Sequence, residues 1–131
     1  MWRLLIVVLV ALVLFCGCTP TGYRDLLHSW TLQFEMRTEN LVMAYKMQNS
    51  FLMYDAVKEL NTVLKEPASW KVPTEFAGVH SHLLAACQYY QQVCLIALSD
   101  DAYSRLSESN FYVTKANEEL SQATSEAKQI P

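Results

Sequence analysis

Histidines are the first residues of this chain to test for metal or catalytic chemistry. The sequence has three, His28, His80 and His82. A zinc pair on one helix needs ligands three or four positions apart, whereas His80 and His82 are two apart and would point to nearly opposite sides of a helix. We therefore predict no histidine zinc pair. His80 is expected to be a hydrogen-bonded residue between helices, and His82 is expected to face outward.

The cysteines Cys87 and Cys94 are the next candidates for chemistry. They are seven positions apart, so on a helix their Cα atoms would lie roughly 10 Å apart, beyond the roughly 7 Å that a disulfide tolerates. A helical segment therefore keeps them from pairing with each other. We expect two buried thiols that act as small apolar residues, with a disulfide between two copies of the chain as the alternative.

Methionines form a stripe at helical spacing. Met43 and Met47 are four apart, and Met36 lies one heptad earlier. Thioethers are soft ligands that select Cu(I), so a copper site is one hypothesis, and the candidate ligands are Met43, Met47, His80, Cys87 and Cys94. Methionine also fills core gaps and lines partner surfaces. A core or interface stripe is therefore the preferred interpretation, and no cofactor or metal is predicted.

Acid–base catalysis by paired carboxylates needs two acids that converge in a pocket, and the carboxylate pairs of this sequence lie among charges of both signs. Glu35 and Glu39 are four apart, as are Asp55 and Glu59, and Lys or Arg lies near each pair. Such pairs are typical of a solvated helix face rather than of a pocket with converging acids. The sequence also has no phosphate-binding glycine loop and no haem-attachment motif. We predict that the chain is not an enzyme.

The first seventeen residues have the three parts of an export signal. Arg3 supplies a positive charge, positions 4–15 are continuously apolar, and Phe15-Cys16-Gly17-Cys18 closes the run. A membrane-spanning helix needs about 20 apolar residues, and this run is shorter. This segment is therefore a candidate for an ordinary cleaved signal peptide or, less simply, for an uncleaved membrane anchor. The residues that close it suggest a third interpretation.

Those closing residues resemble the lipobox of bacterial lipoproteins. The resemblance implies that 1–17 is a helical signal peptide and that Cys18, after the small Gly17, becomes the lipidated, palmitate-bearing first residue. It also implies a bacterial cell-envelope location, with the protein attached to a membrane and facing away from the cytoplasm. Thr19 stands where an Asp would favour retention at an inner membrane, so the outer membrane is favoured if the cell has two.

Length and charge limit what the rest of the chain can be. Positions 18–23 are predicted to be a lipidated tether, and positions 24–131 are enough for a single domain with its own core. The whole chain has a formal net charge of −3, and loss of Arg3 with the leader makes it more negative. A mildly acidic protein lacks the basic field that phosphate backbones require. Nucleic acid is therefore excluded as a predicted partner.

Hydrophobic periodicity predicts an all-α fold. Positions 24–65 contain neither proline nor glycine and predict one long helix, with Asn49-Ser50 as the place for a bend. Further helices are expected at about 74–98 and 101–128. Each of these two carries a seam in steps of four and three, the first at positions 76, 80, 83, 87, 90, 94 and 97.

Three helices of this kind predict a small up-down-up three-helix bundle with one long first helix. A long helical hairpin with a kinked second arm is the alternative. The layout, with Pro73, Phe76 and His80 opening the second helix, loosely resembles small helical-bundle lipoproteins of uncharacterised function.

The predicted function follows from the expected location of the protein and from its expected helical fold. We expect a membrane-anchored, extracytoplasmic lipoprotein that acts as a non-catalytic helical interaction or structural module. Its contact with the membrane would be Cys18, and a protein partner or a second copy would bind the side of the first helix that carries Met36, Met43 and Met47. A lipoprotein that binds a small ligand or copper between its helices is the alternative.

Overall fold

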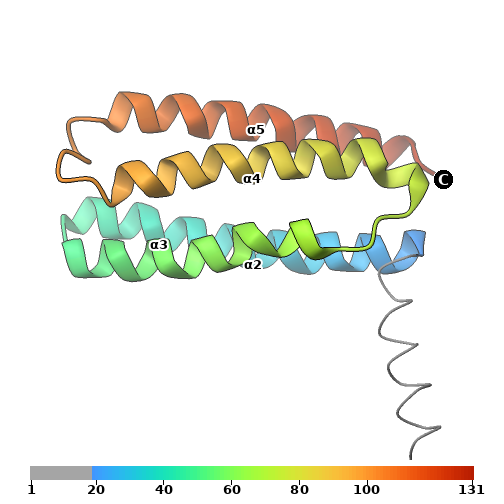
Figure 1. Ribbon diagram of the computed structural model, residues 1–131, viewed down its shortest axis with the longest axis horizontal. Coiled ribbons are helices and arrows are strands. Elements are labelled where there is room, and N and C mark those ends of the chain that lie inside the picture. Colours follow the sequence, from blue (N-terminus) through green and yellow to red (C-terminus); the bar gives the residue numbers. More distant parts are fainter. Residues whose placement is uncertain (1–18) are drawn as a thin grey trace, which may run out of the picture.

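Residues 19–131, the part of the chain that the computed structural model describes, form four α-helices in an up-down-up-down arrangement (Figure 1). The helices are α2 (Pro20–Met47), α3 (Ser50–Lys65), α4 (Ala77–Ala97) and α5 (Leu106–Gln129). No strand occurs among these residues, so the predicted all-α class is confirmed. The predicted signal-peptide helix and Cys18 lie outside the described residues.

The single long helix predicted over 24–65 is wrong, and with it the three-helix bundle and the hairpin with one kinked arm. The chain reverses at Gln48, which has left-handed backbone angles (φ 50°, ψ 38°) and closes α2 through its backbone N–H. Asn49 then starts α3 by accepting a hydrogen bond from the backbone N–H of Leu52 at 3.0 Å. The reversal lets α2 and α3 bury their apolar faces together, which one continuous helix could not do.

A contact between α2 and α3 shows how this hairpin is held. The indole Nε1 of Trp30 donates a 2.8 Å hydrogen bond to the carbonyl oxygen of Val63 inside the core. Trp30 also stacks on Phe34, with ring centroids 4.9 Å apart. A buried indole needs a partner for its N–H, so this bond fixes how α3 lies against α2.

Two short 3₁₀ helices, η1 (Glu66–Ser69) and η2 (Thr74–Phe76), connect α3 to α4. Pro67 lies in the first turn of η1, and Pro73 precedes η2, where its fixed backbone angle suits a helix start. Trp70 lies between them and packs on Tyr23, with ring centroids 6.0 Å apart. The connector therefore covers the end of the bundle at which α2 begins.

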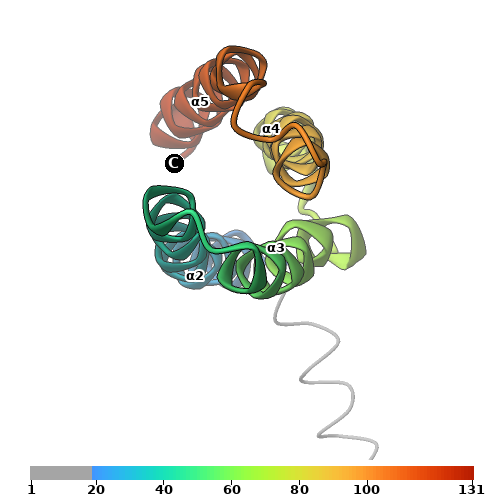
Figure 2. The same cartoon turned by 90° about the vertical axis from the view of Figure 1, so that its left-hand side faces the viewer.

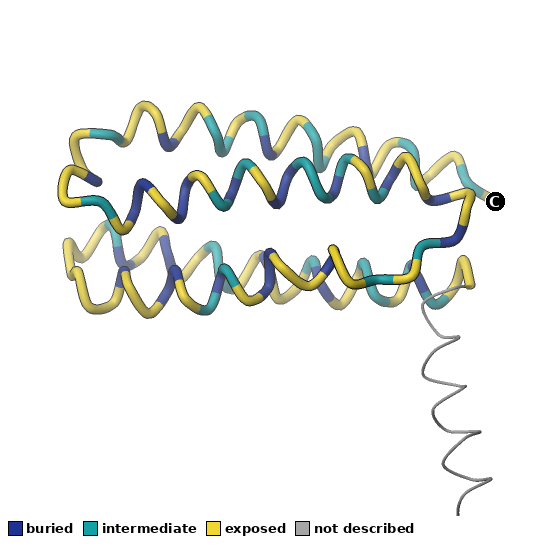
Figure 3. Tube along the Cα trace, viewed as in Figure 1, coloured by how far each residue is buried: buried dark blue, intermediate teal, exposed yellow. Residues whose placement is uncertain are grey.

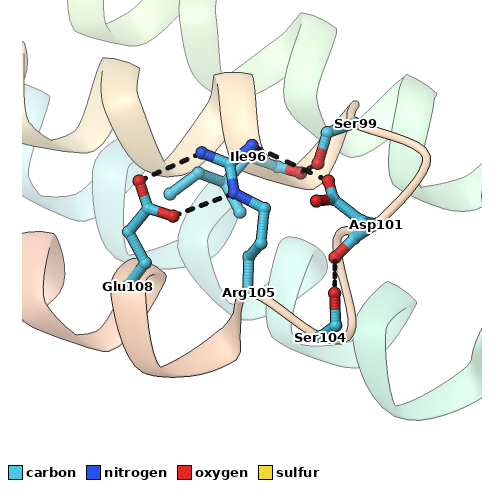
Figure 4. A network of polar contacts seen from close by, with 6 residues as sticks. All are labelled: Ile96, Ser99, Asp101, Ser104, Arg105 and Glu108. Atoms are coloured by element: carbon cyan, nitrogen blue, oxygen red, sulfur yellow. Dashed lines mark hydrogen bonds and ion pairs between the residues drawn. The ribbon is translucent and has the colours of Figure 1, made fainter.

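The last helix begins later than predicted. Residues 98–105 form a turn, and α5 starts at Leu106 rather than at position 101. Figure 4 shows why: Arg105 reaches back to Asp101 and forward to Glu108, whose carboxylate it holds at 2.9 and 3.0 Å. Asp101, expected near the helix start, instead accepts hydrogen bonds inside the turn, one of them from the Ser104 hydroxyl at 2.8 Å.

The helices follow one another around the bundle, so each contacts its neighbours in sequence (Figure 2). The seam predicted on α4 points inward, with Leu83, Cys87, Tyr90 and Cys94 all buried. The inward positions of α5 are mostly small, among them Ser109, Ala116 and Ala123. Figure 3 shows buried residues along the facing sides of the helices and mostly exposed residues at the turns of both hairpins.

Candidate functional site

The methionine surface, defined as Met36, Met43 and Met47, lies on the outer side of α2. The core side of α2 buries Trp30 and Leu41, while Met43 and Met47 are each 60% exposed. The helix therefore has apolar residues on two sides, of which only the side with Trp30 and Leu41 contacts the core.

A shallow hollow of about 270 Å³ lies between α2 and α3 beside this surface. Met43, Met47 and Leu52 supply its apolar wall, and Asp55 and Glu59 supply an acidic edge. Glu59 is also held by the guanidinium of Arg37, which ties α2 to α3 at this point. The hollow thus combines flexible thioethers with negative charge.

Further large apolar side chains are exposed at the hairpin end, the end of the bundle formed by the 48–49 and 98–105 turns. Phe51 is 75% exposed and Tyr54 61% exposed, and both lie in the first two turns of α3. Leu98 and Tyr103 are exposed on the second turn. Exposed apolar residues gathered in this way mark candidate interaction surfaces.

A larger groove, the α2–α5 groove, opens between the first and last helices of the bundle. Its volume is about 480 Å³. Tyr90 and Val93 of α4 lie on its inner side, and Ser109, which is only 5% exposed, lies on its α5 side. Its other lining residues come from α2, from α5 and from the two turns at the hairpin end: Thr38, Leu41, Val42, Tyr45, Lys46, Gln48, Tyr103, Leu106, Asn110 and Val113.

One polar atom in this groove lacks a partner. The hydroxyl of Tyr45 is buried and makes no hydrogen bond with any residue of 19–131. Burial raises the pKa of Tyr45, and the neighbouring Ser109 hydroxyl opposes that rise without reaching hydrogen-bond geometry. A buried polar group without a partner is costly, so a ligand group that formed a hydrogen bond with this hydroxyl would remove that cost.

The candidate copper ligands are not brought together. Cys87 and Cys94 are free and buried in the core of α4, while Met43 and Met47 are exposed on α2. Burial raises the pKa of both thiols to about 12, which keeps them protonated, whereas metals bind the thiolate. Within residues 19–131, no group of three or more His, Cys, Asp or Glu side chains has the arrangement of a metal site.

His80 lies at the other end of the bundle from the methionine surface. Its Nδ1 is hydrogen bonded to the Tyr23 hydroxyl at 3.1 Å, and Trp70 and Phe76 complete an aromatic cluster around them. Burial lowers the pKa of His80 and raises that of Tyr23 to about 12, so both groups are neutral near pH 7. This confirms the prediction of a hydrogen-bonded histidine between helices.

His82 was expected to face outward, and 31% of its side chain is exposed at the surface. Its contacts with α5 were not predicted: Nδ1 lies 2.5 Å from Oε2 of Glu119 and Nε2 lies 3.0 Å from Oε1 of Glu126. These hydrogen bonds, with Glu119 the larger cause, raise the pKa of His82. Glu119 and Glu126 are seven apart on α5, a spacing that could have indicated a shared partner on a neighbouring helix.

No described helix is both long enough and apolar enough to cross a bilayer. The predicted lipidation site Cys18 lies outside the described residues, immediately before Thr19, the N-cap of α2.

Comparison of the chain with protein-family models, with curated proteins and with solved structures finds no match. Its function must therefore be argued from its own sequence and geometry.

Proposed function

We propose that the chain is a membrane-anchored, extracytoplasmic lipoprotein that acts as a non-catalytic helical interaction module. The anchor in this proposal is Cys18, which rests on the lipobox-like sequence. Each acyl CH₂ buried in a membrane contributes about 0.8 kcal/mol, so two or three chains on Cys18 would hold the protein at the surface.

The arrangement of the helices supports this division of roles. The start of α2 and the C-terminus lie at one end of the bundle, and both hairpin turns lie at the other (Figure 1). The 28 residues of α2 make a rod about 42 Å long at 1.5 Å per residue. A lipid on Cys18 would therefore place the hairpin end about that far from the bilayer.

The observation that carries the proposal is the exposure of the methionine surface beside the hollow between α2 and α3. Met43 and Met47 contribute apolar area that the folded bundle leaves in water. Flexible thioethers adapt to irregular partner surfaces, and the acidic edge formed by Asp55 and Glu59 favours a partner with positive charge around an apolar centre.

A paired substitution tests this surface. The double variant Met43→Glu and Met47→Glu should keep the helical signal and unfolding midpoint of the parent, because both side chains are exposed. In-cell crosslinking of the full chain should then lose a partner, or a second copy, that the parent captures. The matched control Gln33→Glu and Gln92→Glu adds the same charge at exposed polar positions and should keep that capture. Unfolding of the methionine variant, or unchanged capture, would refute the proposal.

The anchor is tested separately by intact-mass measurement. The parent should gain acyl mass on Cys18, and Cys18→Ser should not. An unprocessed chain with Met1 still attached would contradict this part.

Binding of a small ligand between the helices is the second candidate function. The α2–α5 groove favours it, because its volume of about 480 Å³ falls within the usual range for ligand sites, about 300–1,000 Å³. The scattered placement of the candidate copper ligands favours an organic ligand over Cu(I). A dye that is bright only in apolar surroundings should bind the parent and be lost when Ser109→Leu fills the groove. The proposal of a protein-interaction module does not predict that a dye binds in this groove.

A further inference from the structure

We propose that the α2–α5 groove binds an unesterified long-chain carboxylic acid in its ionised form, with the hydrocarbon chain between the helices and the carboxylate near Tyr45 and Lys46. This proposal rests on the small-ligand function and names its ligand class.

The groove exists because of a mismatch in side-chain size between two helices. α2 presents Leu41, Val42 and Tyr45, whereas α5 presents Ser109 where a larger residue would close the gap. The helices α2 and α5 are also neighbours that make few contacts with each other, unlike α4 and α5. A volume of about 480 Å³ holds on the order of 15 groups of water size. This suits a single hydrocarbon chain and not a folded protein segment.

The apolar lining residues favour a hydrocarbon chain as the part of the ligand that lies inside the groove. Leu41, Val42, Val93, Leu106 and Val113 give the groove an apolar wall that suits hydrocarbon. A branched-chain wall of this kind binds through buried area and sets no exact chain length.

Two polar features point to a negatively charged head group. Lys46 is the charged residue among the lining residues, and it makes no ion pair with any residue of 19–131. The Tyr45 hydroxyl, one residue away, is buried without a partner. A carboxylate supplies the acceptor that the Tyr45 O–H lacks and the charge that Lys46 lacks, through a charge-assisted hydrogen bond. An amine would place a second cation beside Lys46.

The experiment uses photoreactive probes on the full chain reconstituted in phosphatidylcholine vesicles. A long-chain acid with a diazirine on its hydrocarbon is crosslinked by light, and the labelled peptides are identified by mass spectrometry. We expect labels on the α2 and α5 residues that line the groove, and competition by unlabelled palmitic acid. The alcohol of equal chain length should label about tenfold less and the amine less still.

Two variants test the residues. Ser109→Leu should abolish labelling of the groove while Ser107→Leu, the same change at an exposed α5 position, leaves it unchanged. Tyr45→Phe should weaken labelling about fivefold, as expected for one lost hydrogen bond. Tyr54→Phe, the matched change at an exposed tyrosine, should have no effect. Circular dichroism of each variant shows whether it folds. If Ser109→Leu does not fold, the labelling of Tyr45→Phe decides whether the proposal holds.

The outcomes distinguish the assignment of a carboxylate ligand from the broader proposal that the groove binds a small ligand. Equal groove labelling by acid, alcohol and amine would overturn the carboxylate assignment and leave small-ligand binding intact. Labelling by a diazirine phospholipid in the vesicle instead of the unesterified acid would identify a membrane lipid and overturn the proposal of an unesterified acid. Labels that avoid the groove, or that survive Ser109→Leu in a folded protein, would overturn both the carboxylate assignment and the small-ligand proposal.

Discussion

Replacing Gly78 with alanine should stabilise α4 and at the same time loosen its contact with α5. Gly78 lies in the first turn of α4, and a Cβ at this position would lie 2.6 Å from Oε2 of Glu126. Alanine in place of helical glycine gains about 0.4–1 kcal/mol, chiefly by restricting the unfolded chain. The Glu126 carboxylate is the end of a flexible side chain, so it can move aside, but it then leaves Nε2 of His82, which it contacts at 3.0 Å.

The contact with His82 makes the net effect depend on pH. The pKa of His82 is raised above its ordinary value of 6.5, first by Glu119 and then by Glu126. A histidine with a raised folded-state pKa contributes stability that is fully present below pH 6.5 and is lost as the pH rises through the folded-state pKa. Gly78→Ala should therefore gain nearly its full 0.4–1 kcal/mol at about pH 8.5, and clearly less at about pH 5.5.

The assay is urea unfolding followed by circular dichroism at both pH values. The set comprises the parent, Gly78→Ala, Glu126→Gln and the double variant, with Gly22→Ala in the first turn of α2 as the control. Glu126→Gln should remove the pH dependence of the Gly78→Ala effect, and Gly22→Ala should show none. An equal gain from Gly78→Ala at both pH values, or a pH dependence that survives Glu126→Gln, would refute this reasoning.

Three other residues or pairs give further predictions. Asn49→Ala removes the side chain that caps α3 and should cost about 1 kcal/mol in urea unfolding, whereas Asn49→Asp should cost little. Cys87 and Cys94, whose thiols have pKa values of about 12, should react with iodoacetamide at pH 8 only after unfolding; rapid labelling of the folded chain would show that α4 is not buried as described. Burial lowers the pKa of His80 below 6.5, so the unfolded state takes up a proton first; in a His82→Gln background, stability should fall as the pH drops below 6.5, and His80→Gln should remove that fall.

The all-helical class and the core face of α4 could be predicted because they depend on local pattern alone. The residues Cys87, Tyr90 and Cys94 recur in steps of three and four and are buried together. Helical spacing also predicted the methionine stripe of α2, which lies in water and not in the core.

The reversal at Gln48 could not be predicted from turn chemistry. Left-handed backbone angles favour glycine or asparagine, and here the residue that adopts them is a glutamine. Asn49 was identified only as the place for a bend, although its side chain caps a new helix. What decides between a bend and a reversal is the burial gained when α3 folds back on α2, which is a tertiary effect.

The α2–α5 groove and the place of His82 depend on which helices become neighbours. Ser109 is one more small residue in the sequence, and it leaves a gap only because Tyr45 lies across from it. His82 likewise contacts α5 only because the turn at 98–105 sets the register of α5 against α4. Both features became visible only with the helices in place.

Arg24 joins the first turns of α2 to the end of α5, and this has a consequence for the order in which the helices assemble. Its guanidinium donates to the carbonyl oxygens of Ala127 at 3.3 Å and Ile130 at 2.7 Å, across more than a hundred residues of sequence. Most other helix–helix contacts join elements that follow one another, so each hairpin can form locally, and such topologies fold within about microseconds to milliseconds. Closure by Arg24 spans the longest loop and should come last, which makes the tail of α5 the first segment to exchange its amide protons with water.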